Sequence, residues 1–316
     1  MDMSKTEQNY RGLKDYLRLV FSGFCMGAAD LVPGVSGGTM AFIMGIYEDL
    51  IHAIHAIDLN FIRNLFRLRI KEAFYDFPWR FLLFLALGLF TALFTLASSL
   101  TWALENHPVL VWAFFFGLVL ASILVVRKRV VDWRPGLFSI VALMATITYI
   151  VMGSIPLETP DAPWFLFISG AIAISATILP GISGAFIMVL LGRYEHLLNA
   201  VANRELLILM FYTAGAGLGV MSFARVLRWL FKHYHDQTVA AMIGIIFGAL
   251  RRVWPWKETG LSPENHSAPA PNILPPFSSA EDVLALGLMA LGITVVLLLE
   301  YLSNRPLNYA GKESLE

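Results

Sequence analysis

The sequence predicts an all-helical protein that crosses a membrane many times and is built from two related halves. Of its 316 residues, 57% are hydrophobic and only 15% are charged, and the mean hydropathy is +0.66. A soluble domain of this size would carry about 25% charged residues. Several apolar runs also exceed the roughly 18 residues that a membrane-spanning helix needs. The third observation is a helix-breaking motif that occurs twice and divides the chain.

The repeated motif reads P-G-[VI]-S-G and lies within two longer segments that align without a gap. Residues 29–53 match residues 176–200 at a constant offset of 147, and ten pairs are identical. These pairs are Ala29/Ala176, Pro33/Pro180, Gly34/Gly181, Ser36/Ser183, Gly37/Gly184, Gly45/Gly192, Tyr47/Tyr194, Glu48/Glu195, Leu50/Leu197 and Ala53/Ala200. A chain that repeats such a break within apolar sequence is expected to use it.

Each half is expected to contain one broken helical element and three apolar helices. The first half (16–153) follows a polar tail (1–15). It has a broken element at 16–55, an interfacial amphipathic segment at 58–80 and helices at 81–104, 108–126 and 135–153. The second half (164–302) precedes a tail (303–316). It has a broken element at 164–201, helices at 206–230, 238–250 and 283–302, and a proline-rich loop at 255–281. A second offset of 131, which aligns Gly88 with Gly219, extends the duplication into the helices.

The distribution of Lys and Arg predicts how the broken elements lie in the membrane, because these residues accumulate in cytoplasmic loops. If both elements are re-entrant hairpins and the N-terminus is cytoplasmic, 18 of the 23 Lys and Arg residues lie inside; if the elements cross, only 9 do. With hairpins, each half crosses three times, so the second half is inverted and both termini are cytoplasmic. The sequence therefore predicts two re-entrant hairpins, about six full transmembrane helices and an inverted repeat, which is typical of secondary transporters.

Both breaks have the composition of an anion-binding site. Pro33 and Pro180 remove backbone donors, and the glycines, among them Gly34 and Gly181, permit tight turns. The second arm of each break then begins with unpaired amides at the positive end of a helix dipole. We expect the breaks to meet and to bind a phosphate-sized anion at Ser36, Gly37, Gly38, Thr39, Ser183 and Gly184. Alternatively, these small residues only let helices approach closely.

Two glutamates in otherwise apolar segments are candidates for coupling transport to an ion. Glu48 and Glu195 could carry protons, as ionisable groups in apolar segments often do. Alternatively, they are interfacial carboxylates beside Tyr47 and Tyr194, which are candidates for gating.

Charged residues elsewhere in the two halves are further candidates. Arg193 is expected to meet anionic headgroups or to lie at the interface, and Arg225 and Arg228, about one helical turn apart, are candidate phosphate contacts. Asp30 precedes the first break and could take part in gating. Because its counterpart is Thr177, we expect the acid to stand outside the repeated device.

No catalytic residue, cofactor or metal site is predicted. The sequence shows no convergent pattern of Cys, His and carboxylate ligands. The G-x-G-x-G of residues 215–219 lies inside an expected helix with no strand before it, so it predicts close helix packing rather than nucleotide binding. The formal net charge is zero, which gives no general attraction to nucleic acid.

The duplicated motif, GAADLVPGVSGGTMAFIMGIYEDL and ILPGISGAFIMVLLGRYEHLL, resembles a bacterial and archaeal membrane family once described only as a domain of unknown function. That family is associated with transport of polyprenyl phosphates, notably undecaprenyl phosphate, and the resemblance covers about residues 17–302. It implies return of the lipid carrier from the outer to the inner leaflet of the cytoplasmic membrane for cell-envelope synthesis. Proton or sodium coupling and the oligomeric state stay open.

Two other classes of function are alternatives to lipid transport. A membrane polyprenyl-diphosphate phosphatase would carry a loop resembling P-G-x-S-R-S, but both breaks here lack the arginine that would hold the leaving phosphate. An ion or small-anion transporter could use the same scaffold. A lipid phosphate requires a lateral opening to the bilayer, whereas an ion requires a closed aqueous path.

Overall fold

The computed structural model describes residues 12–31, 35–57, 61, 63–64, 67–69, 72, 74, 77–154, 159–160, 162–258, 271–277 and 279–303. Within these residues the chain is helical, apart from one isolated antiparallel bridge between Lys257 and Asn272. This bridge joins the two ends of the proline-rich loop, whose residues 259–270 lie outside the described part. About half of the predicted interfacial segment at 58–80 also lies outside it.

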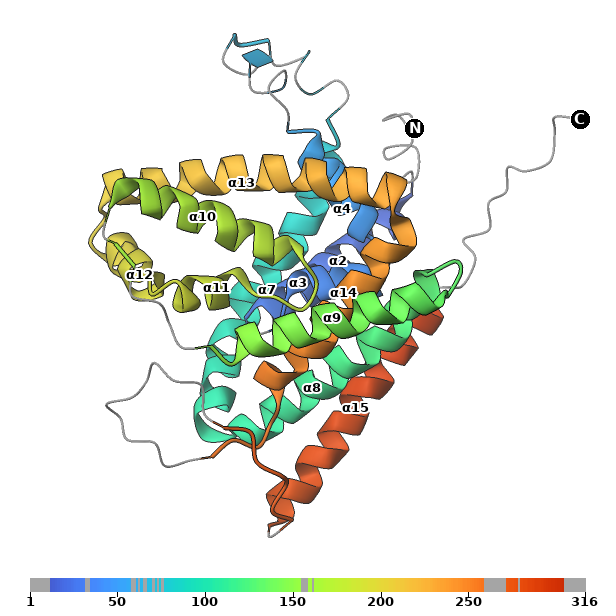
Figure 1. The fold of residues 1–316 in the computed structure, drawn as a ribbon. Coiled ribbons are helices and arrows are strands. Elements are labelled where there is room, and N and C mark those ends of the chain that lie inside the picture. Colours follow the sequence, from blue (N-terminus) through green and yellow to red (C-terminus); the bar gives the residue numbers. More distant parts are fainter. Residues whose placement is uncertain are drawn as a thin grey trace, which may run out of the picture.

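The helices occur in the same order in the two halves (Figure 1). The first half contains α2 (Leu13–Asp30), α3 (Gly37–Ile43), α4 (Tyr47–His55), α7 (Trp79–Asn106), α8 (Pro108–Val126), the short 3-10 helix η1 (Arg127–Arg129) and α9 (Pro135–Met152). The second half contains α10 (Pro163–Ile178), α11 (Gly184–Leu190), α12 (Tyr194–Ala202), α13 (Leu206–His233), α14 (His235–Val253) and α15 (Ala280–Ser303). Each predicted broken element is therefore three helices with two interruptions.

In the described part of the chain, five helices are long and apolar enough to cross a membrane: α7, α8 with η1, α9, α13 and α15. The sequence predicted about six, and the sixth, expected at 238–250, exists as α14 but does not meet this criterion. The reason is its charge, because Asp236 near its start and Arg251 and Arg252 near its end are too many charged side chains for a helix of 19 residues. Its residues Val239, Ala240 and Ile246 are fully buried, and His235, Asp236, Arg251 and Arg252 occupy its two ends.

Glycines bring the first helices of each half into backbone contact. α2 packs on α7 and α10 packs on α13 (Figure 1). A Cβ atom at Gly88 would collide with the carbonyl oxygen of Val20, and one at Gly215 would collide with that of Phe167. The predicted packing role of the G-x-G-x-G segment is confirmed for Gly215 and Gly219, whereas Gly217 faces open space.

These contacts correct the second offset. α7 and α13 begin at Trp79 and Leu206 and end at Asn106 and His233, which places them 127 residues apart rather than 131. Gly88 therefore corresponds to Gly215 and not to Gly219. The sequence comparison slipped by four residues, about one helical turn, because Gly215 and Gly219 lie on the same face of α13.

The last helices of the two halves are exchanged. α9, from the first half, packs on α14, and α15, from the second half, packs on α8. Close approaches mark both pairs: Gly244 lies against the backbone of Val141, and Gly117 lies against that of Met289. α8 and α14 also pack on each other at the centre. Neither half can therefore form its full core alone.

Candidate functional site

The two breaks lie against each other, as the repeat predicts. Ser36 Oγ donates to the carbonyl oxygens of Thr177 (3.3 Å) and Leu179 (3.4 Å). Thr39 Oγ1 accepts a hydrogen bond of 2.9 Å from the amide of Gly181. Ser36 and Thr39 are buried, so these bonds form away from water, where losing a partner is costly. Segments more than 140 residues apart thus form one polar contact inside an apolar protein.

The tyrosine that follows the first break extends this contact. Tyr47 is fully buried, and its hydroxyl donates to the carbonyl oxygen of Ile178 over 3.0 Å. Its ring lies against that of Phe42, with centroids 3.9 Å apart. Since α10 ends at Ile178, Tyr47 satisfies a backbone acceptor that the end of the helix leaves free.

The contact is asymmetric although the motifs are nearly identical. Side chains of the first break bond to the backbone of the second break, while their counterparts do different things. Ser183 makes no side-chain cap to its own helix, and Tyr194 is partly exposed. Phe186, the counterpart of Thr39, packs with Met152 and Ala249 in a small apolar cluster. Identical residues, such as Ser36 and Ser183, therefore make different contacts in the two halves.

The amide-rich end of α3 is capped from within the first break. The amide of Gly37 donates to Asp30 Oδ1 over 2.6 Å, and the amide of Gly38 donates to Ser36 Oγ over 3.1 Å. The Asp30 carboxylate therefore occupies the position where a negative charge is most stabilised by the helix dipole. At the end of α3 where we expected an anion to bind, an acid of the same chain accepts from the first amide.

The position of Asp30 is matched in the second half, although its residue type is not. Its carboxylate lies directly against Gly37, and the hydroxyl of Thr177, its counterpart, lies directly against Gly184, the counterpart of Gly37. The position is thus repeated in both halves, and only its chemistry differs, acid in one and hydroxyl in the other. The acid itself has no counterpart in the second half, where the Thr177 hydroxyl donates to Ala173 O instead.

A repeated glycine explains the turn after each short helix. Gly45 and Gly192 have φ angles of +76° and +64°, in the region that L-residues with a side chain rarely adopt. They end α3 and α11 and let α4 and α12 begin two residues later. Gly181, in the second break, also has a positive φ, +87°. Pro33 and Gly34 lie outside the described residues, so the corresponding turn of the first break is not seen.

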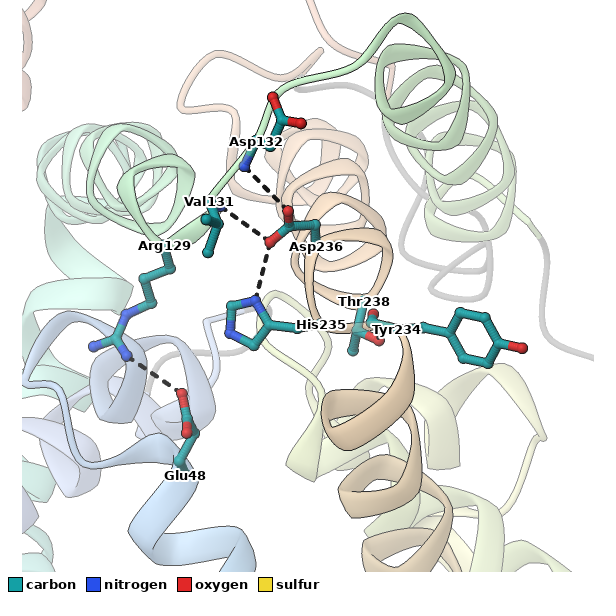
Figure 2. Close-up of polar contacts among 8 residues, drawn as sticks. All are labelled: Glu48, Arg129, Val131, Asp132, Tyr234, His235, Asp236 and Thr238. Carbon is teal, nitrogen blue, oxygen red and sulfur yellow. Dashed lines mark hydrogen bonds and ion pairs between the residues drawn. The ribbon is translucent and has the colours of Figure 1, made fainter.

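Two arginines that the sequence analysis counted only for topology support the far end of α3. Arg18 Nη2 donates to the carbonyl oxygen of Met44 over 3.3 Å, and Arg129 Nη2 donates to that of Phe42 over 3.2 Å. Arg129 also lies 3.8 Å from the carboxylate of Glu48 (Figure 2). Cations at a helix C-terminus are stabilised by the dipole, so both ends of α3 are electrostatically satisfied.

Comparison with known proteins identifies the family to which the chain belongs. Residues 26–269, which include both breaks, match the model of the undecaprenyl phosphate translocase-like family. The chain belongs to this family. It is 39% identical over 245 residues to a polyprenyl-phosphate transporter of Vibrio cholerae, covering 78% of this chain and 80% of that protein. It is 28% identical over 262 residues to one of Staphylococcus aureus, covering 77% and 87%. No solved structure matches.

This member of the translocase-like family holds one loop contact that sequence patterns do not reveal. Asp236, at the start of α14, accepts hydrogen bonds from the amides of Val131 (3.0 Å) and Asp132 (3.1 Å) (Figure 2). His235 Nδ1 lies 3.1 Å from the same carboxylate. The contact ties the α8–α9 loop to the central helix. Asp236 follows no motif and was not predicted.

The remaining predicted residues of this family member lie at varied distances from the breaks. Arg193 is buried, and its guanidinium donates to the hydroxyl of Thr159 (2.9 Å) and to the Thr159 carbonyl oxygen. Glu195 is exposed at the start of α12. Arg225 is exposed and donates to Met221 O within α13, and Arg228 Nη1 lies 3.0 Å from His55 Nδ1 on α4.

Proposed function

We propose that this chain moves a polyprenyl phosphate, such as undecaprenyl phosphate, from the outer to the inner leaflet of the cytoplasmic membrane and so recycles the lipid carrier. The two relatives described above are named polyprenyl-phosphate transporters. The observation that carries the proposal is the buried contact between the two breaks, made by Ser36 and Thr39. Neither break has the arginine expected of a phosphatase, so the proposed activity is translocation without hydrolysis.

The proposed phosphate site comprises the amides and hydroxyls of both breaks. Its residues are Ser36, Gly37, Gly38 and Thr39 with Pro33 and Gly34 from the first break, and Ser183 and Gly184 with Pro180 and Gly181 from the second. The phosphate would take the amides of α3 that Asp30 and Ser36 now hold, because a doubly charged anion benefits more from a helix N-terminus than a single carboxylate does. Asp30 is then a gating residue, which yields its place to the substrate.

The proposed topology has both breaks as re-entrant hairpins that enter from opposite faces. It is supported by the distribution of Lys and Arg. It gives each half three crossings, so the second half is inverted relative to the first. α14 then crosses as the sixth, buried helix. Arg225 and Arg228 are proposed to meet lipid phosphate near the surface, while Arg193, with its partners on Thr159, is proposed to hold α12 in place beside Tyr194.

The topology predicts where single cysteines are labelled. In a Cys25→Ala background, Leu68→Cys reports the segment between the first break and α7, and Asn203→Cys reports the segment between α12 and α13. Both positions are exposed. We expect a membrane-impermeant maleimide to label Asn203→Cys from outside intact cells and Leu68→Cys only after permeabilisation. Labelling of both from the same side would contradict the inverted arrangement.

Reconstitution tests the activity itself. We expect proteoliposomes that contain the purified protein to move labelled undecaprenyl phosphate between leaflets without releasing inorganic phosphate. Chloride and free phosphate flux are measured in the same vesicles. Phosphate release would support a phosphatase, and anion flux without lipid transfer would support a small-anion transporter. Either result would overturn the proposed function.

We further propose that Glu48 and Glu195 couple transport to a proton gradient, with Tyr47 fixing the arm that carries Glu48. Glu48 faces Arg129, so its protonation would release that arginine from an ion pair. We expect Glu48→Gln to reduce the dependence of lipid transfer on an imposed pH gradient more than Glu195→Gln does. Full gradient dependence in both variants would remove these carboxylates from the mechanism.

A further inference from the structure

Two hollows open on the surface where α8, α9 and α14 meet. α14 packs on both α8 and α9 (Figure 1). The first hollow, of about 580 Å³, lies at the N-terminal end of α9 and is lined by residues that include Ile123, Val141 and Ile243. The second, of about 410 Å³, lies at the C-terminal end of α9 and is lined by residues that include Phe116, Ala145 and Phe247. Both volumes fall within the usual range for ligand pockets.

The hollows follow one another along a single face of each helix. On α9, Phe138 and Val141 line the first hollow, and Ala145 and Tyr149 line the second. Spacings of three and four residues place these side chains on one stripe, which is about 16 Å long. We call the two hollows together the α8–α9 groove. It runs along a helix that is long and apolar enough to span the membrane.

The chemistry of the groove suits an apolar chain with an anionic end. Its walls are mainly apolar, and Phe138 and Phe247 remain 60% and 56% exposed, although most of the helix that carries Phe247 is buried. Among the described residues, none that lines either hollow is acidic.

Each end of the groove carries an arginine. Arg127 is exposed at the end of the first hollow, beside Lys128, which is bound to Glu300 over 2.8 Å. Arg251 lines the second hollow and is held on the ring of Tyr149, with its guanidinium carbon 4.3 Å from the ring centre. Guanidinium groups bind phosphate with two parallel hydrogen bonds. A free small anion would gain nothing from the apolar walls between these ends, whereas a lipid phosphate would bury its chain there.

The central helix connects the groove to the breaks. On α14, Ile246 lies against Gly181 of the second break, and Ala249 lies against Phe186. Ile243, Phe247 and Leu250 line the hollows from the neighbouring face of the same helix. α14 is therefore a wall shared by the phosphate site and the groove.

We propose that the α8–α9 groove holds the isoprenoid chain of a polyprenyl phosphate, with the phosphate at Arg127 when the lipid is in one leaflet and at Arg251 when it is in the other. This inference rests on the proposed function and adds to it the path of the chain beside the two breaks. Because the groove runs along α9, a helix long and apolar enough to span the membrane, the chain would stay in contact with the bilayer while the headgroup crosses.

Three substitutions on one helix test the groove. Val141→Trp fills the first hollow and Ala145→Trp fills the second, whereas Leu143, between them, is 60% exposed and lines neither. The probe is undecaprenyl phosphate with a diazirine in its isoprenoid chain, and adducts are mapped by mass spectrometry. We expect adducts on α8, α9 and α14 at groove residues, with yields about tenfold lower in V141W or A145W at the filled hollow. L143W should stay within about twofold of wild type.

A second variant controls for misfolding of the tryptophan variants. Val141→Cys, in a Cys25→Ala background, is purified, shown to be folded, and then blocked with a benzyl thiosulfonate. We expect blocking to reduce labelling at the first hollow as V141W does. Equal loss in L143W and V141W, or equal labelling of the same residues by phosphatidylglycerol with the same diazirine, would overturn the proposal. A change of oligomeric mass on blocking, measured by light scattering, would assign the groove to a second copy of the chain and also overturn it.

The experiments distinguish a failure of the groove proposal from a failure of the proposed function. Groove labelling by the polyprenyl probe without lipid transfer by the wild-type protein would leave the binding site and remove the transport activity. Lipid transfer by wild type with adducts outside the groove, or with normal rates in V141W and A145W, would leave the activity and remove the groove.

Discussion

Thr39→Val is expected to abolish most lipid transfer by separating the two breaks. Valine keeps the shape of threonine but cannot accept the hydrogen bond from the amide of Gly181, which would then be buried without a partner. An orphaned buried donor costs about 1–3 kcal/mol. We expect a lower melting temperature in detergent and lipid transfer reduced by about tenfold or more. The measurements are thermal unfolding and the reconstituted transfer assay.

Matched controls separate this contact from a general effect of the substitution. Thr238→Val is also a buried threonine change, but the hydroxyl of Thr238 donates only to Tyr234 O, at the start of its own helix. Ser36→Ala and Ser183→Ala provide a second comparison, because only Ser36 bonds across to the other break. We expect S36A to lower stability and S183A to leave it within about 0.5 kcal/mol of wild type. Equal destabilisation by S36A and S183A, or by T39V and T238V, would contradict the asymmetric contact.

Gly215→Ala is expected to destabilise the second half strongly. The added methyl group would collide with the carbonyl oxygen of Phe167, so α10 and α13 would have to separate. Overpacking of this kind costs about 1–3 kcal/mol and more where backbone must move. We expect a large drop in the yield of monodisperse protein and in its melting temperature in detergent.

The same segment supplies the control. Gly217→Ala meets nothing within 4 Å and lies in the middle of α13. Replacing an exposed helix glycine with alanine stabilises by roughly 0.5–1 kcal/mol. The two substitutions, two residues apart, should therefore move stability in opposite directions. If Gly217→Ala proved as damaging as Gly215→Ala, the close packing of α10 and α13 would not be the cause.

Several features of the fold could be predicted because they depend on local sequence. Apolar runs between polar segments predicted the helices α7, α8, α9, α13 and α15 to within a few residues, since the hydrophobic requirement of a bilayer acts along each helix separately. The constant offset of 147 predicted that the two broken elements match, and α3 and α11 both span seven residues. The Gly45/Gly192 pair belongs to the same alignment, but the positive φ of both glycines is seen only in the structure.

Other features could not be predicted because they depend on neighbours that are distant in sequence. The identity of Ser36 with Ser183 gave no sign that one bonds across the breaks and the other does not, because the difference arises from which carbonyl groups lie opposite. In the sequence, Arg129 is only the last of three consecutive basic residues. Its contact with Phe42 O depends on how α8 lies against α3. Asp236 belongs to no motif, and its partners lie more than 100 residues away.

The sequence by itself determined that this is a helical membrane protein of two related halves with a helix break in each, because hydropathy, proline and glycine act on the chain locally. Only the tertiary structure decided that the breaks touch through Ser36 and Thr39, that Asp30 occupies the amides of α3, and that α9 and α15 are exchanged between the halves. These depend on which surfaces meet across the core, and nearly identical motifs meet different surfaces there.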